Sequence, residues 1–233
     1  MQFLLDHLSA FFVFSSIVLI IAVMQLRGMQ SNAETVVNYM VRTGTLNISE
    51  MLERDLMNMR TAAQVDSAIS NSVFTAPTGV TGFECTFSMS TDTTVSFSFP
   101  TLADPQAIAT ASDLADAPVV QVVYQLTPQP GSITRSVGGV DLVHQLYRLD
   151  RFAADTPSGW SNEGVTFFRI EFAERGSPVF QVPGGFNCPS ALSKVRFQIQ
   201  MAHEGFDDIT DQASKSQLNF SRYGSTVELS SWD

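Results

Sequence analysis

The stretch LSAFFVFSSIVLIIAVMQL, residues 8–26, contains no charged side chain, and its only polar residues are three serines and one glutamine. At a rise of about 1.5 Å per residue, a helix of that length approaches the roughly 30 Å hydrocarbon core of a bilayer. The Phe3-Leu4-Leu5 run just before it can extend the span. We therefore predict a transmembrane anchor over residues 1–28, with the rest of the chain attached to it.

A cleaved secretory signal and a buried core helix are the two alternatives for this stretch. A signal has a basic N-terminal region and a small-x-small cleavage site. This chain begins MQFLLDH, with Asp6 and no lysine or arginine, and no convincing A-x-A sequence follows the apolar run. A core helix that is apolar on all sides suits the end of a soluble protein poorly. The sequence therefore favours an anchor that stays in the membrane.

The charge balance argues against a nucleic-acid partner. The 233 residues include 13 basic and 23 acidic ones, a formal net charge of −10, whereas a nucleic-acid partner calls for a basic face.

The sequence gives only a weak signal for the orientation of the predicted span in the membrane, because the only basic residue near it is Arg27, on its C-terminal side. On its own, the positive-inside rule mildly favours a C-terminal domain in the cytoplasm.

The sequence contains no recognisable catalytic motif. The three histidines are scattered, and no zinc, phosphate-binding or nucleophile-elbow motif is present, so we predict no cofactor and no enzymatic activity. Asp207, Asp208 and Asp211 offer the oxygen ligands that calcium prefers, but their spacing fits no EF-hand loop. A solvated acidic loop is the favoured interpretation of these aspartates, and no metal site is predicted.

The chain has two cysteines, Cys85 and Cys188. In an oxidising compartment they can pair and close a loop of about 100 residues, which stabilises a fold by a few kcal/mol in the chain-entropy model. The alternative is two buried thiols. The disulfide is slightly favoured, and whether it forms depends on the redox conditions of the compartment.

Helical periodicity continues beyond the predicted span, over residues 29–72. Thr43-Gly44-Thr45 predicts an interruption near residues 43–47, and Asn47 with Glu50 resembles a capping-box restart. After it, apolar residues spaced mostly by three and four predict an amphipathic helix to about Ser70. Its apolar face includes Ile48, Leu52, Leu56 and Met59.

From residue 73 to 233 the pattern is that of a β-rich domain. Apolar and polar residues alternate over residues 83–89 and 95–99, which predicts a hairpin. Pro-Gln-Pro-Gly at 128–131 predicts a turn, and residues 155–164 predict a loop. Further strands are predicted at 119–126, 133–137, 142–150, 164–174, 191–201 and 226–230. The predicted fold class is α+β, with a long N-terminal helix followed by a mostly antiparallel sheet.

Several segments, taken in order, resemble type IV pilin-like proteins, most closely the J/W-type minor pilins and pseudopilins of type IV pilus and type II secretion systems. QFLLDHLSAFFVFSSIVLII lies over the family's N-terminal pattern, with Asp6 at its intramembrane glutamate and Phe14-Ser15 on its Phe-Ser. MLERDLMNMR resembles the family's LERDLR segment. VVYQL, LYRLDR, GVTFFRIEF and PSALSKVRFQI follow its usual strand order. Each motif is short, and the ordered set carries the resemblance.

The resemblance implies a single-pass protein of the bacterial inner membrane, with its β-domain in the periplasm or outside the cell. Its partners would be membrane lipid and other membrane-anchored subunits that pack against the N-terminal helix. Assembly would use the charge of Asp6, with Phe14, and the apolar face of the second helical half. Two departures are an aspartate in place of glutamate and only Met1 before Gln2, where a prepilin carries a basic leader ending in glycine.

Three hypotheses for function follow. The leading one is a non-enzymatic structural subunit that packs through its N-terminal helix into a filament or helix bundle. The alternative is an accessory subunit of a larger integral membrane complex that keeps a pilin-like shape, which the missing leader favours. The third is a membrane-anchored enzyme or ligand-binding module.

Overall fold

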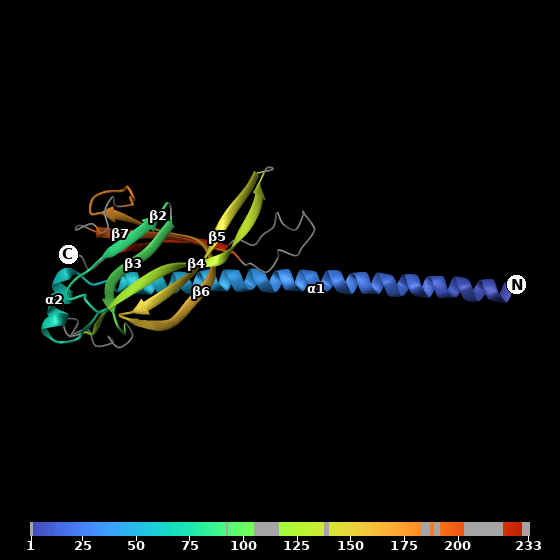
Figure 1. The fold of residues 1–233 in the computed structure, drawn as a ribbon, viewed down its shortest axis with the longest axis horizontal. Helices are drawn as coiled ribbons and strands as arrows, with labels where there is room; N and C mark the ends of the chain where they lie inside the picture. The colour runs from blue at the N-terminus through green and yellow to red at the C-terminus, as the bar shows by residue number, and fades with distance from the viewer. Residues whose placement is uncertain are drawn as a thin grey trace. The chain divides into compact units, whose positions relative to one another are not determined.

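The chain divides into two compact units, Met1–Met40 and Val41–Asp233, which we describe separately. Its class is α+β, as predicted, with an N-terminal apolar helix and a large antiparallel sheet (Figure 1). The computed structural model describes residues 2–91, 93–104, 117–137, 140–182, 187–188, 192–202 and 221–229.

Helix α1 spans Gln2–Met57 and continues through residues 43–47, where the sequence predicted an interruption. The Thr45 hydroxyl donates to the Val41 carbonyl at 2.7 Å, and the Ser49 hydroxyl donates to the Thr45 carbonyl at 2.8 Å. Such bonds to the preceding turn satisfy small polar side chains inside a helix. One helical glycine costs only about 1 kcal/mol, which burial of the neighbouring side chains outweighs. The predicted interruption is therefore wrong.

The predicted helix to about Ser70 is in fact two helices. After α1 ends at Met57, helix α2 covers Ala62–Ser70. Thr61 caps it: its hydroxyl accepts from the Gln64 backbone N–H at 3.4 Å, and the Gln64 side chain accepts from the Thr61 N–H at 3.0 Å. This T-x-x-Q capping box is a sequence signal for a helix start that the prediction overlooked.

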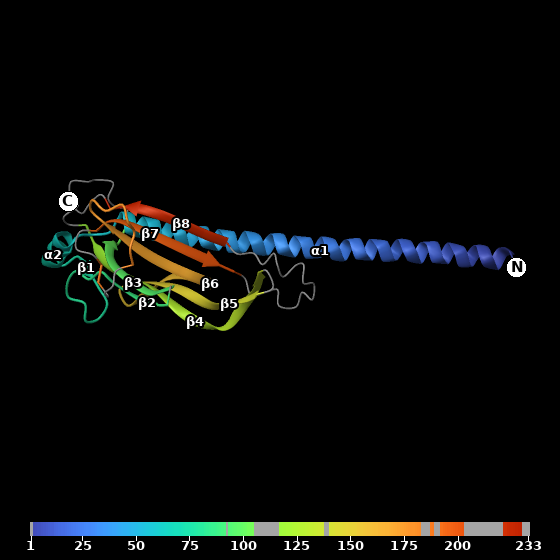
Figure 2. The ribbon, with the colours of Figure 1, turned by 90° about the horizontal axis from the view of Figure 1, so that it is seen from above.

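In the described part of the chain, seven strands form an antiparallel meander in chain order, and β1 pairs in parallel with β4 (Figure 2). Strands that follow one another in the chain thus lie next to one another in the sheet, which is the commonest arrangement. The bounds are β1 Phe74–Thr75, β2 Thr86–Ser90, β3 Thr93–Leu102, β4 Val119–Val137, β5 Val140–Ala153, β6 Thr156–Glu174, β7 Leu192–Met201 and β8 Ser221–Glu228.

Two predicted breaks lie inside strands. The Pro-Gln-Pro-Gly stretch forms an irregularity within β4, where the pairing with β5 shifts register between Pro128 and Ser132. Strand β6 begins at Thr156, inside the predicted loop 155–164, because a tight turn at Ala154 (φ 53°) joins it directly to β5. In both places, pairing with β5 continues through residues whose sequence is typical of a turn or loop. A local sequence pattern does not reveal that pairing.

In the second unit, the final turns of α1 lie along one face of the sheet (Figures 1 and 2). Aromatic rings fill the core there: the centroids of Phe97 and Phe99 are 4.6 Å apart, and those of Phe97 and Phe172 are 5.9 Å apart. The apolar face assigned to assembly is part of this core, with exposed fractions of 0% or 1% for Ile48, Leu52, Leu56 and Met59. The chain's own domain covers these side chains, so their assignment as a contact surface for other subunits is wrong.

Candidate functional site

In the first unit, the notable feature is the uncovered apolar part of α1. Phe11–Met29 is long and apolar enough to cross a membrane, with a mean hydropathy of 2.0 and none of its window buried. Its large apolar side chains are 42% to 70% exposed. A signal sequence near the N-terminus meets the same length and composition criteria.

The two residues that the resemblance assigns to assembly in this unit both belong to α1. Phe14 is 66% exposed, as a side chain that contacts lipid or another helix must be. Asp6 lies within the helix, eight residues before Phe14, and its side chain is outside the described part of the structure.

In the second unit, a buried ionic cluster joins α1 to the sheet. The Asp55 carboxylate, whose side chain is 3% exposed, accepts two hydrogen bonds on Oδ2. The Tyr124 hydroxyl donates at 2.6 Å from β4, and Arg151 Nε donates at 2.6 Å from β5. Tyr124 and Arg151 are directly paired across the two strands, so the sheet register places them together. The Thr101 hydroxyl adds a bond of 2.8 Å to the Asp55 carbonyl.

The environment of this cluster shifts the pKa values of its members. Burial raises the pKa of Tyr124 well above 10, and the charge of Asp55 and its hydrogen bond raise it further. Burial alone would lower the pKa of Arg151, but the hydrogen bond and charge of Asp55 outweigh it, so the net shift is upward. A neutral tyrosine and a cation thus face one carboxylate, an arrangement in which each group is paired. We interpret the cluster as a clamp between helix and sheet.

Sequence reasoning did not identify this cluster, although all three residues lie in motifs that carry the pilin-like resemblance. Asp55 is the aspartate of MLERDL, Tyr124 the tyrosine of VVYQL, and Arg151 the last residue of LYRLDR. The separations of 69 and 96 residues from Asp55 follow no short-range pattern. A charged residue at a core-facing helical position was the available signal, because such residues are rarely buried without a partner.

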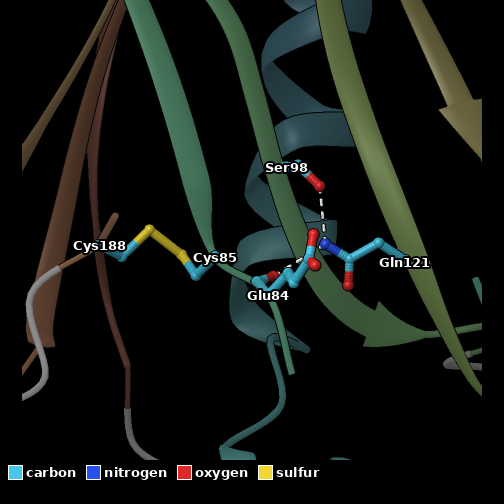
Figure 3. Close-up of a disulfide and its surroundings, with 5 residues drawn as sticks. All are labelled: Glu84, Cys85, Ser98, Gln121 and Cys188. Carbon is cyan, nitrogen blue, oxygen red and sulfur yellow. Dashed lines mark hydrogen bonds between the residues drawn. A yellow bond between two sulfur atoms is a disulfide. The ribbon is translucent and has the colours of Figure 1, made fainter. Parts of the chain in front are cut away.

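The two cysteines form a disulfide between Cys85 and Cys188, with their Cα atoms 5.3 Å apart (Figure 3). The Cys188 N–H also donates to the Cys85 carbonyl at 2.9 Å, and Thr86 is bridged to Asn187. These bonds attach part of the segment between β6 and β7 to the start of β2. A link across 103 residues removes on the order of 4 to 5 kcal/mol of loop entropy from the unfolded chain in the chain-entropy model.

A buried amide beside the disulfide ties the segment that leads into β2 to the sheet. Gln121 on β4 donates from Nε2 to the Glu84 carbonyl at 2.8 Å and to the Ser98 hydroxyl at 2.7 Å (Figure 3). Glu84 directly precedes Cys85 in the chain. The disulfide and Gln121 therefore hold this segment from two sides, an arrangement that serves structure.

Metal ligands are not brought together in the part of the chain that the structure describes, where no group of three or more histidine, cysteine, aspartate or glutamate side chains could hold an ion. The weak calcium candidates Asp207, Asp208 and Asp211 lie outside the described residues. His144 lies on β5, apart from any such group.

No protein-family model, curated protein or solved structure matches this chain.

Proposed function

We propose that this chain is a membrane-anchored, non-enzymatic structural subunit of the kind that minor pilins and pseudopilins represent. The observation that carries the proposal is the uncovered apolar helix Phe11–Met29. Burying one large apolar side chain is worth about 1.5 to 3 kcal/mol, so leaving this whole segment in water would cost on the order of 20 kcal/mol. Lipid, or helices of neighbouring subunits within lipid, removes that cost.

The second unit supports a structural role. Its ionic cluster pairs the buried Asp55 carboxylate with Tyr124 and Arg151, and these contacts join α1 to the sheet. MLERDL, VVYQL and LYRLDR, three of the segments that resemble pilin-like proteins, each supply one member of this cluster. One set of contacts would therefore explain why these three segments follow the pilin-like pattern. The disulfide supports placing the domain in an oxidising compartment, such as the periplasm, because cytosolic thiols are usually kept reduced.

Membrane anchoring is tested by introducing charge into the span. Val18→Lys with Ile21→Lys is expected to release a larger fraction of the chain from membranes during alkaline carbonate extraction than the unmodified sequence does, because each lysine at mid-span costs about 2.5 to 3.5 kcal/mol. Val179→Lys is the matched control, since Val179 is an exposed valine of the second unit. Release of the unmodified chain would reject the anchor.

Subunit identity is tested by purifying the intact chain in mild detergent. We expect stoichiometric recovery with other single-span subunits. In the family pattern, the carboxylate at this position is proposed to neutralise the N-terminal amine of a neighbouring subunit. Asp6→Ala should therefore reduce this recovery several-fold without lowering expression, because an unpaired charge in an apolar bundle is costly. Asp6→Glu, which restores the residue common in the family pattern, should keep it. Recovery with an unrelated multi-span complex would replace the filament role with the accessory role.

A further inference from the structure

The far ends of β4 and β5 leave the rest of the sheet as a two-stranded arm (Figure 1). We define the hairpin arm as Ser132–Val137 paired with Val140–Gln145. Six residues at about 3.3 Å each give it a length of about 20 Å. The residues of the two strands are paired without a gap from Ser132 opposite Gln145 to Val137 opposite Val140, so the arm is a continuous ladder.

The bend at the base of the arm is built into the sequence. The β4–β5 ladder shifts register between Pro128 and Ser132, and Gly131 has a φ of 136°, a value that favours glycine. Gln145 holds this bend, since its Nε2 donates to the Gln129 carbonyl at 2.7 Å and to the Gly131 carbonyl at 3.0 Å. The arm is thus directed away from the sheet by a fixed feature, as irregularities in strands commonly do.

The root of the arm is packed, and its tip is not. Ile133 and Leu146 are 5% and 1% exposed and form a small core cluster with Ala202. Beyond that root, Val140, Leu142 and Val143 are 61%, 47% and 66% exposed. The root therefore stabilises a projecting ribbon that presents apolar side chains at its end.

These apolar side chains lie on both faces of the ribbon. Alternation along β5 puts Val140 and Leu142 on one face and Val143 on the other, together with exposed Asp141. A flat protein surface contacts one face of a ribbon, whereas the interfacial layer of a bilayer surrounds both. Asp141 limits the depth to that layer, because a charge at the bilayer centre is costly and one near the surface stays hydrated.

Chain length limits how far from a membrane the second unit can begin. Met29, the end of the candidate span, lies twelve residues before Val41, where the second unit begins. Even fully extended, those residues cover only about 40 Å, so an anchored helix keeps the start of the second unit within about 40 Å of the end of the span. Tethering raises the effective concentration of a second contact, so a small apolar tip suffices for binding.

We propose that the tip of the hairpin arm is a second membrane contact, which inserts Val140, Leu142 and Val143 into the interfacial layer of the bilayer that holds the N-terminal helix. This inference rests on the proposed anchoring. A bilayer contact would fix the orientation of the domain over the membrane, a property that a single helix leaves free.

The experiment places a fluorescent probe at the tip of the full chain in phosphatidylcholine vesicles. An engineered cysteine is the only reactive thiol, because both natural cysteines are in the disulfide. Val143→Cys carries the probe at the tip, and Val179→Cys, 55% exposed in the segment after β6, is the matched control. We expect quenching by lipids with a nitroxide near the headgroup to be at least about twofold stronger at position 143 than at 179.

The outcomes separate this inference from the anchoring on which it depends. Equal, water-like emission from both probes on a chain that stays in the vesicles would overturn the membrane contact alone. A chain that does not stay in the vesicles would overturn both. As a second variant, Val140→Ser with Leu142→Ser in the Val143→Cys background should lose the excess quenching. Persistence of the quenching in that variant would also overturn the proposal.

Discussion

Asp55 is the residue on which the attachment of α1 to the sheet depends. We predict that Asp55→Ala destabilises the second unit by about 3 to 5 kcal/mol, because it leaves a buried arginine without its partner. The matched control is Glu53→Ala on the same helix. Glu53 accepts one bond of 3.0 Å from Tyr223 in a partly exposed site, and its loss should cost about 1 kcal/mol. Denaturant unfolding followed by near-UV circular dichroism measures both, and equal losses would contradict the clamp.

Tyr124 makes stability depend on alkaline pH. Its pKa in the folded chain is raised well above 10, mainly by burial. Well below pH 10 the tyrosine is protonated in both states, so its contribution is fully present. As pH rises past 10 the unfolded chain loses the proton first, and folding stability falls. Urea unfolding between pH 8 and pH 11 should show this decline.

The control for the pH prediction is a pair of substitutions. Tyr124→Phe removes the titrating group and should flatten much of the decline, at the cost of one hydrogen bond to Asp55. Tyr39→Phe removes an exposed tyrosine from the first unit and should leave the decline unchanged. An unaltered slope in Tyr124→Phe would show that Tyr124 is not the group responsible.

At the scale of elements, the start of the β6–β7 ladder depends on one glycine. Gly164 has a φ of 80°, and an added Cβ would lie 2.3 Å from the Ala202 carbonyl oxygen. Gly176 has nearly the same φ, 81°, and open space around it. Gly164→Ala should therefore cost at least about 2 kcal/mol more than Gly176→Ala, because both carry the backbone strain and only the first adds a clash. Thermal unfolding compares them, and equal losses would contradict the close approach.

The elements predicted well from sequence are those with strong local periodicity. The apolar helix and the antiparallel character of the sheet follow from spacings of 3.6 and 2, which a linear pattern records. The break at Met57 was missed because the Thr61–Gln64 capping box lay inside a continuing apolar stripe. The extension of β4 through its prolines was missed because pairing with β5 maintains the strand there.

The candidate site was harder to predict from the sequence than the fold was. Ile48 and Leu52 formed an evident apolar face, but the sequence does not say whether a face packs on its own sheet or on another chain. Asp55, Tyr124 and Arg151 meet only because the sheet register brings β4 and β5 together under α1. Long-range contacts of this kind depend on topology, which short motifs do not encode.

For the molecule as a whole, the proposed function depends on whether the N-terminal helix stays on the chain and holds it in the membrane. A retained anchor and a removed signal sequence give the same helix prediction and differ in the mature protein. The acidic balance of the chain, with a net charge of −10, gives no competing reason for it to associate with an anionic membrane surface. Membrane association would therefore report on the helix.

The most direct measurement is the intact mass of the chain recovered from the membrane fraction after carbonate extraction. We predict a membrane-retained species whose mass includes Phe11–Met29, close to the 25.5 kDa of the full sequence. A species found only in the soluble fraction, with a mass that lacks this segment, would contradict a retained membrane anchor.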